Sequence, residues 1–410
     1  MKVAVCNLGC KVNKYECDCI VTALRRMGHE VVTALEPADA YIVNTCAVTG
    51  EAERKSRQFV TRCLRQNPSA TVAVIGCASQ HDASAFRSKS GVTYIGGVAD
   101  KAAAAVRFCE KATDVAPLPL EYDGLCDPAE DRTRAYIKVQ DGCDNFCSYC
   151  LIPYLRGRSR SRALADCVAE CEAVAARSRE IVLTGIDLSS YGKNIGSSLA
   201  ELIAALKDVD VRIRLGSLEV GVVDEKLLGA LKGLKRFCPQ FHLSLQSGGD
   251  AVLKRMNRHY TSAQYAAKVA LIREAFPDAA VTTDLICGFP TETEGDFEQS
   301  LAFVESMRFA QVHVFGYSPR SGTVAAKLPQ LPANVVEERV ARAVAVAEKC
   351  KREFLSALVG KRLDVLAEQY EDGCTSGHSL EFVKAYIPGR HDGELSVTVK
   401  QLYKDGVIAE

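Results

Sequence analysis

Short apolar runs alternate with longer segments of helical periodicity over the first 112 residues. The strand-like runs, rich in β-branched residues, cover residues 3–6, 41–44, 71–75 and 92–95. Between them, apolar residues recur at helical spacing over residues 14–27 and 50–66. This alternation predicts an α/β domain, residues 1–112, built on a doubly wound parallel sheet.

A proline-rich and acidic segment, residues 113–133, predicts a linker to a second domain at residues 134–358. Six strand-like runs there cover residues 135–139, 181–183, 211–215, 241–245, 281–286 and 311–315. Helical patterns separate them, for example at residues 164–176, 199–206 and 296–307, and a long one at 335–358 closes the region. Six β/α units predict a partial (β/α)6 barrel rather than an eight-unit one.

The last part of the chain, residues 359–410, changes character again. Its strand-like runs cover residues 362–368, 381–386, 394–402 and 407–409. Asp-Gly and Pro-Gly pairs separate the runs, which is typical of tight turns between strands. This segment therefore predicts a small all-β module.

Composition places the chain among ordinary globular proteins. Of 410 residues, 48% are hydrophobic and 25% charged, which excludes a disordered or fibrous chain. The 51 basic residues balance 51 acidic ones, so a nucleic-acid partner would need locally concentrated charge. With no apolar run near the ~18 residues of a membrane helix and no secretory leader, we expect a cytoplasmic protein without membrane contact.

Eighteen cysteines are the outlying feature of the composition. In a reducing compartment, cysteine clusters more often indicate metal or redox chemistry than disulfides. Cys143, Cys147 and Cys150 form a Cys-x3-Cys-x2-Cys motif just after the first strand of the predicted barrel. Three thiolates can hold three irons of a 4Fe–4S cluster and leave one iron open, because a closed cluster needs four. A zinc site or three unrelated buried cysteines are the alternatives, although zinc usually takes two pairs of ligands.

Three further cysteines follow predicted strands of the N-terminal sheet. Cys46 and Cys77 come directly after strands, and Cys10 lies in the loop after the first strand. The carboxyl ends of parallel strands share one edge of a sheet, where ligands bind. Although a single cysteine is more often a small buried hydrophobic residue, three in the same topological position predict a second three-thiol cluster site.

The Cys-x3-Cys-x2-Cys motif, with Tyr149 before its last cysteine, resembles the radical S-adenosylmethionine (SAM) superfamily. Further segments that resemble this superfamily are residues 241–248, 255–258 and 284–293. The resemblance implies that SAM binds the open iron and that an electron from the cluster cleaves it to a 5′-deoxyadenosyl radical. By the same resemblance, Tyr149, Glu219 and Gln246 are candidate SAM contacts, the alternative for Glu219 and Gln246 being ordinary polar groups of the barrel. No catalytic residue beyond the cluster ligands is assigned.

The layout of the whole chain resembles the methylthiotransferases, which join a three-cysteine domain to a radical SAM barrel and a β module called TRAM. Residues 8–16, 44–49 and 313–323 are most similar to the branch acting on N6-threonylcarbamoyladenosine at position 37 of tRNA. The resemblance implies two 4Fe–4S clusters, the one at Cys10, Cys46 and Cys77 supplying or carrying sulfur. It also implies SAM as methyl donor and radical source, a 2-methylthio group on carbon 2 of adenine as product, and an electron-donor protein as partner.

Alternatives remain for the substrate and for the class of protein. Relatives acting on dimethylallyladenosine carry Gly-Cys-Gln-Met-Asn at the first cysteine, and those modifying a ribosomal-protein aspartate carry Cys-x-Lys-Asn. Lys11-Val12-Asn13 matches neither pattern, but both substrates stay open. A noncatalytic iron–sulfur protein that transfers electrons or binds RNA is the alternative from a different class.

The chain departs from the family pattern at four positions. The family usually has proline where this chain has Val220, Gly316 and Ser321, and glycine where it has Thr291. Glycine at such a turn often permits a positive φ, so Thr291 bears on the geometry of the cofactor loop.

Local positive charge predicts where the tRNA anticodon loop binds. Two basic segments directly follow cluster cysteines and contribute the candidate phosphate contacts Arg54, Lys55, Arg57, Arg156, Arg158 and Arg160. A solvated charged face is the alternative for both. Residues 361–410 carry six basic and nine acidic residues, a net charge of 6 − 9 = −3, so we expect the first two domains to supply most of the phosphate contacts.

Overall fold

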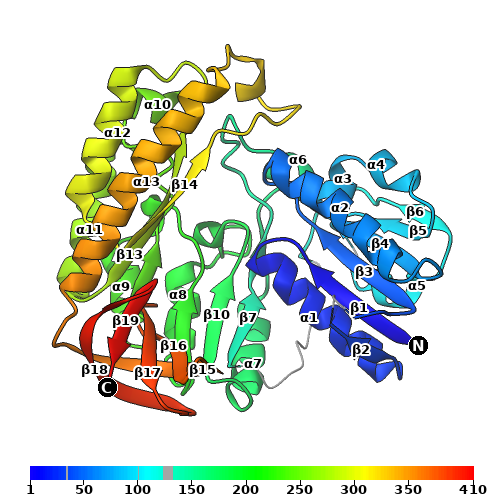
Figure 1. The fold of residues 1–410 in the computed structure, drawn as a ribbon, viewed down its shortest axis with the longest axis horizontal. Coiled ribbons are helices and arrows are strands. Elements are labelled where there is room, and N and C mark those ends of the chain that lie inside the picture. Colours follow the sequence, from blue (N-terminus) through cyan, green and yellow to red (C-terminus); the bar gives the residue numbers. More distant parts are fainter. Residues whose placement is uncertain (34–35, 100, 123–132) are drawn as a thin grey trace.

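The computed structural model describes residues 1–33, 36–99, 101–122 and 133–410. Figure 1 shows an N-terminal sheet domain in blue and cyan beside a central region in green to orange, with a small red unit at one end of the latter. Residues 123–132 of the predicted linker lie outside the described residues. The mixed α/β fold class predicted from the sequence is confirmed.

The N-terminal domain is a six-stranded, fully parallel sheet in the order β2-β1-β3-β4-β5-β6. Its strands are β1 (Lys2–Asn7), β2 (Glu30–Val32), β3 (Ala40–Thr45), β4 (Thr71–Gly76), β5 (Val92–Gly96) and β6 (Ala112–Asp114). The helices are α1 (Lys11–Arg26), α2 (Gly50–Gln66), α3 (Cys77–His81), α4 (Ser84–Arg87) and α5 (Ala103–Arg107). The three-residue edge strands β2 and β6 were not predicted, because they are too short to show an alternating pattern.

Strand alternation gives this sheet two buried faces. Tyr41 and Val43 of β3 pack in a cluster with Val60 of α2, whereas Ile42 packs on the other side with Ile20 of α1. Successive side chains of a strand point to opposite faces, so strands that are apolar at every position require helices on both sides. The doubly wound arrangement follows from this pattern.

The central region is a six-stranded parallel half-barrel. Its strands are β7 (Arg134–Lys138), β10 (Glu180–Thr184), β11 (Arg212–Leu215), β12 (Gln240–His242), β13 (Ala280–Cys287) and β14 (Gln311–Gly316). They form two three-stranded sheets joined by parallel bridges between Ile213 and Phe237 and between Leu218 and Leu243. The six units predicted from the sequence are therefore present in the predicted order.

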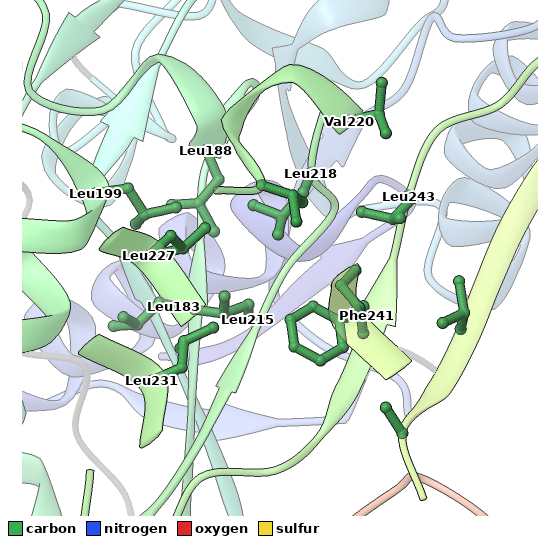
Figure 2. Packing of buried hydrophobic residues seen from close by; sticks show 14 of the residues in the cluster. Leu183, Leu188, Leu199, Leu215, Leu218, Val220, Leu227, Leu231, Phe241 and Leu243 are labelled. Atoms are coloured by element: carbon green, nitrogen blue, oxygen red, sulfur yellow. The ribbon is translucent and has the colours of Figure 1, made fainter. Parts of the chain in front are cut away.

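Helices cover the outer face of this half-barrel. They are α7 (Leu164–Ala175), α8 (Leu199–Ala205), α9 (Glu225–Lys232), α10 (Asp250–Arg255), α11 (Ser262–Ala275), α12 (Glu294–Met307) and α13 (Ala333–Ser356). Figure 2 shows Leu183, Leu215 and Phe241 of the strands packing with Leu199 and Leu227 of flanking elements. The apolar residues of each strand face outward, which leaves the alternate residues to line the inside of the half-barrel.

The C-terminal module is a closed five-stranded barrel in the order β15-β16-β17-β19-β18. Its strands are β15 (Arg362–Glu371), β16 (Cys374–Ser379), β17 (Lys384–Pro388), β18 (Glu394–Tyr403) and β19 (Gly406–Ala409). Strand β16 was not predicted because its sequence, CTSGHS, has no apolar alternation. A Cβ on its Gly377 would lie 2.0 Å from the Leu366 carbonyl oxygen, so glycine permits the close approach to β15.

This module packs against the amino-terminal ends of the barrel strands. Arg134 at the start of β7 pairs with Glu368 at 2.8 Å, and Arg212 at the start of β11 pairs with Glu394 at 3.1 Å. Figure 1 shows the red strands at the end of the half-barrel away from α6 (Ile152–Arg156). Within the described part of the chain, no helix combines the length and the apolar character needed to cross a bilayer.

Candidate functional site

Cys143, Cys147 and Cys150 lie in a tight loop at the carboxyl end of the first barrel strands. The loop follows β8 (Gln140–Asp141), which pairs with β9 (Arg160–Ser161). Gly142, directly before Cys143, has φ +72°, and a Cβ there would lie 2.0 Å from the Arg158 carbonyl oxygen. Only glycine fits a backbone that is both left-handed and this close to another backbone segment. The predicted position of the motif is thus the one observed.

Cys10, Cys46 and Cys77 lie at the carboxyl ends of the adjacent strands β1, β3 and β4. Cys10 is the N-cap of α1, Cys46 follows β3, and Cys77 begins α3. All six cysteines of the two motifs line one cavity of about 300 Å³. The two sets of three thiols, far apart in sequence, therefore face a common space.

Burial disfavours the charged form of two thiols in this cavity. Burial raises the pKa of Cys46 to about 11 and that of Cys150 to about 12. The nearby thiols Cys147 and Cys77 further raise the pKa of Cys150, which places members of the two sets close to each other. A bound cationic metal displaces such protons. Among the residues described as lining the cavity there is no seventh cysteine, so each set offers three ligands and fits a 4Fe–4S cluster with one open iron.

A fully buried guanidinium supports the N-terminal set of thiols. Arg156 Nε donates to Cys77 Sγ at 3.4 Å, and Arg156 Nη1 lies 3.1 Å from Glu16 and 3.2 Å from Asp141. The buried charges of this network are the cations Lys101, Lys138, Arg156 and Arg160 and the carboxylates Glu16 and Asp141. Four cations face two carboxylates, and buried charges need partners of opposite sign. Anionic thiolates at the neighbouring cysteines would balance the excess positive charge.

The network also joins the two domains. Glu16 and Lys101 belong to the N-terminal domain, whereas Lys138, Asp141 and Arg156 belong to the half-barrel. Burial raises the pKa of Glu16, but Arg156, Lys101 and Lys138 outweigh it and hold that pKa well below its usual range. These ion pairs fix the position of one cysteine set relative to the other.

Two of the predicted tRNA contacts are corrected by this network. Arg156 is 0% exposed and Arg160 is 3% exposed, and Arg160 Nη1 donates to the Arg156 carbonyl oxygen at 2.7 Å. Neither guanidinium can contact an RNA phosphate, so this prediction is wrong for both. The charge pattern along the chain did not show that β9 and α6 turn these side chains inward.

The other predicted contacts are exposed but carry acidic partners. The exposed side chains are Arg54, Lys55, Arg57 and Arg158. Glu51 lies 2.5 Å from Arg54 and 3.7 Å from Lys55, and Asp144 lies 3.0 Å from Arg158. Such exposed pairs are weak, so these cations remain accessible to a phosphate.

The three candidate SAM contacts line the cysteine cavity. Tyr149, Glu219 and Gln246 all contribute to its wall. Burial raises the pKa of Glu219, while its ion pair with Arg258 opposes that shift. Arg258 Nη1 also donates to Cys147 Sγ at 3.3 Å, which links Glu219 to the Cys-x3-Cys-x2-Cys loop.

An adjoining cavity of about 330 Å³ contains residues to which no role was assigned from the sequence. Asp187, Asn257 and Arg258 line it together with Glu219 and Cys147. Asn257 Nδ2 donates to the Phe146 carbonyl oxygen at 3.1 Å and so holds the cysteine loop. Asn257 and Arg258 fall in the segment that resembles the superfamily, and this was the available signal, whereas Asp187 lies in an unremarkable segment after β10.

Thr291 occupies a glycine-like position. Its φ is +66°, a left-handed conformation that is costly for a β-branched residue. Thr291→Gly is therefore expected to raise the free energy of unfolding by about 0.5–1 kcal/mol, since strain is relieved at the entropic cost of one glycine. Denaturant unfolding would measure this change.

Thr293→Gly is the matched control for that prediction. Thr293, with φ −77°, is the N-cap of α12 and accepts from Asp296 N. Loss of the cap should lower stability by a few tenths of a kcal/mol. If Thr291→Gly also lowered the free energy of unfolding, the backbone strain inferred at Thr291 would be contradicted.

Family models define the class of the protein. The model of the radical SAM superfamily matches residues 137–304, and one described as uncharacterized protein family UPF0004 matches residues 2–97. The first match contains the Cys-x3-Cys-x2-Cys loop, and the second contains Cys10, Cys46 and Cys77. Together with the half-barrel, this makes the protein a radical SAM enzyme.

Relatives that are similar over nearly the whole chain show which family of radical SAM enzymes it belongs to. One from Thermotoga maritima, named threonylcarbamoyladenosine tRNA methylthiotransferase MtaB, is 38% identical over 99% of this chain and 96% of its own length. A relative of the same name from Bacillus subtilis is 34% identical over 95% and 91%. A third from a Thermoanaerobacter species, named tRNA-2-methylthio-N(6)-dimethylallyladenosine synthase, is 33% identical over 88% and 80%. The chain belongs to the radical SAM methylthiotransferase family.

A solved structure supports the fold. The radical SAM methyltransferase TsrM from Kitasatospora setae, determined with cobalamin and a 4Fe–4S cluster bound, covers 92% of this chain with a TM-score of 0.54. The likeness spans 80% of that chain, at 16% identity, and is a likeness of fold. The cofactors of this protein, as a methylthiotransferase, are SAM and two 4Fe–4S clusters.

Proposed function

We propose that this methylthiotransferase acts on tRNA and adds a 2-methylthio group to carbon 2 of N6-threonylcarbamoyladenosine at position 37. The observation that carries the proposal is the convergence of two three-thiol sets on one cavity, since sulfur transfer and radical formation must meet at the same adenine. The names of the relatives from T. maritima and B. subtilis support the substrate. The dimethylallyladenosine substrate of the Thermoanaerobacter relative is the second candidate.

In this proposal the six cysteines bind the clusters. Cys143, Cys147 and Cys150 would hold the cluster next to SAM, and Cys10, Cys46 and Cys77 would hold the second cluster. When bound, these groups supply a radical that activates carbon 2, a methyl group and a sulfur atom. The three domains are residues 1–114, 134–358 and 359–410, with residues 115–133 linking the first two. The boundary predicted at residue 112 moves to 114 because β6 (Ala112–Asp114) pairs with β5 in the N-terminal sheet.

The protein's own residues position these groups. Tyr149, Glu219 and Gln246 contact SAM, and Arg258 holds Glu219 beside Cys147. Gln246 has φ +67°, and backbone strain at a cavity wall is typical of functional positions. Arg156 keeps Cys77 and the two domains in register through its bonds to Glu16 and Asp141.

The tRNA anticodon loop approaches over the cations that remain exposed, Arg54, Lys55, Arg57 and Arg158. Gly50 N at the start of α2 donates to Ser318 Oγ at 3.1 Å, which joins the start of the helix that carries Arg54, Lys55 and Arg57 to the half-barrel. Arg158 lies over Phe146, and Phe146 packs edge-to-face on Tyr154, which is 51% exposed. Such aromatic side chains stack on unpaired bases. An electron-donor protein completes the set of partners.

Nucleoside mass spectrometry tests this function. In a host lacking the gene, re-expression of the wild-type chain is expected to restore 2-methylthio-N6-threonylcarbamoyladenosine in tRNA, whereas the Cys46→Ala variant restores none. A methylthio mark on dimethylallyladenosine instead would support the second candidate. No change in any methylthio nucleoside would contradict action on tRNA.

A further inference from the structure

The inside of the half-barrel holds a third cavity, of about 390 Å³, to which mostly polar side chains contribute. The inward-facing residues of the strands that line it are Arg134, Tyr136, Val182, Arg214, Gln240, His242, Thr282, Gln311 and His313. Their neighbours in each strand, such as Ile213 and Phe241, belong to the outer core. Because most of the alternate positions are polar, the inside of this barrel is a binding space and not a packed apolar core.

The C-terminal module closes one end of this cavity. The Phe382 ring stacks on His378 with centroids 4.4 Å apart and lies 4.7 Å from the Arg214 guanidinium carbon and 5.1 Å from that of Arg134. At the other end, Ser217 lines both this cavity and the cysteine cavity. A ligand in the cysteine cavity can therefore extend into the half-barrel.

Lys11 faces this cavity from the N-terminal domain. It follows Cys10 directly, and its side chain is accessible to solvent. Across the described ranges, its ammonium has no hydrogen bond and no ion pair within 4.0 Å. By contrast, Arg134 and Arg214 are held by Glu180, at 2.6 Å and 2.8 Å.

The surroundings of Lys11 favour an anion. The Arg134 and Arg214 guanidinium groups line the same cavity as Lys11, and the described residues that line it include no carboxylate. Asp284 already lies 3.3 Å from His242 Nε2. Ligand atoms of His242, Asp284 and His313 lie within 4.8 Å of one another, but three cations nearby oppose a divalent metal there and favour a carboxylate.

We propose that Lys11 selects the substrate by binding the carboxylate of the N6 substituent inside the half-barrel. This inference rests on the proposed function. A threonine attached through its amino group keeps a free carboxylate, whereas a dimethylallyl group carries no charge. Carbon 2 and the carbon that bears N6 both flank N1 of adenine, so an N6 substituent lies on the same edge as the reacting carbon. With the adenine at the cysteines, its substituent reaches Lys11.

Binding to stem-loop RNAs tests this role without turnover. The probes are two anticodon stem-loops with N6-threonylcarbamoyladenosine, one with the free carboxylate and one with the carboxylate converted to a carboxamide. The full-length wild type, without reductant, is expected to bind the carboxylate form about 10- to 100-fold more tightly, which is the range of a hydrogen bond between charged groups. Lys11→Met should reduce this preference to within about threefold by removing that bond.

Lys14→Met is the matched control. Lys14 lies one turn along the same helix and pairs with Asp18 at 2.8 Å, so its variant should keep the full preference. Retention of the preference by Lys11→Met, or its absence in the wild type, would overturn the role of Lys11. The proposed function is tested separately, by methylthio product formed by the wild type from the carboxylate stem-loop. If the wild type forms product and Lys11→Met keeps the binding preference, only the inference about Lys11 is overturned.

Discussion

Cys46→Ala is expected to abolish methylthio transfer while SAM cleavage continues. Cys46 belongs to the N-terminal set of thiols, so its loss leaves the Cys-x3-Cys-x2-Cys loop intact. Cys147→Ala should instead reduce both 5′-deoxyadenosine and methylthio product by at least about 100-fold, because loss of a direct ligand exceeds the effect of losing a supporting residue. The iron content should be about four per chain in each variant, compared with about eight in the wild type.

The measurements are iron content and 5′-deoxyadenosine formed under strong reductant by reconstituted protein. Cys109→Ala is the control, because Cys109 is exposed and is not among the residues described as lining the cavity. It should retain all the iron and both activities. Loss of 5′-deoxyadenosine in Cys46→Ala would contradict the assignment of separate roles to the two sets.

Arg156→Met is expected to lower the free energy of unfolding by about 3 kcal/mol, at the lower end of the cost of breaking a buried ion pair. The variant removes the Arg156 Nη2 donor, which lies 2.8 Å from Asn13 Oδ1. It also removes one ion-pair partner from Glu16 and one from Asp141. Lys101, Lys138 and Arg160 still pair with those carboxylates, which limits the loss. Urea unfolding of the full chain would measure the change.

Arg158→Met makes the same chemical change two residues away. Arg158 is 72% exposed and contacts only Asp144 among the acidic groups described, so its loss should change stability by less than about 0.5 kcal/mol. For tRNA binding we expect Arg158→Met to have the larger effect of the two variants. It removes a phosphate contact and should therefore lower the salt dependence of binding. Equal stability of the two variants would contradict the structural role of Arg156.

The two basic segments show where reasoning from the sequence stops. Arg156, Arg158 and Arg160 are alternate residues of one run, but only Arg158 reaches solvent. The acids that hold the other two, Glu16 and Asp141, come from α1 and β8. A charge run shows that positive charge is present, whereas the partners of each charge depend on elements distant in the chain.

Local pattern determined the architecture and the metal chemistry. Short apolar runs alternating with helical segments predicted the parallel strands, because strands buried on both faces need helices on both sides. The spacing of Cys143, Cys147 and Cys150 predicted a loop with three cluster ligands. Tertiary structure alone decided the rest. It brought the two cysteine sets to one cavity, buried Arg156, and placed Lys11 beside a polar half-barrel closed by Phe382. These features depend on contacts between domains. The residues that make such contacts lie far apart in the sequence, so no local pattern along the chain indicates which of them pair.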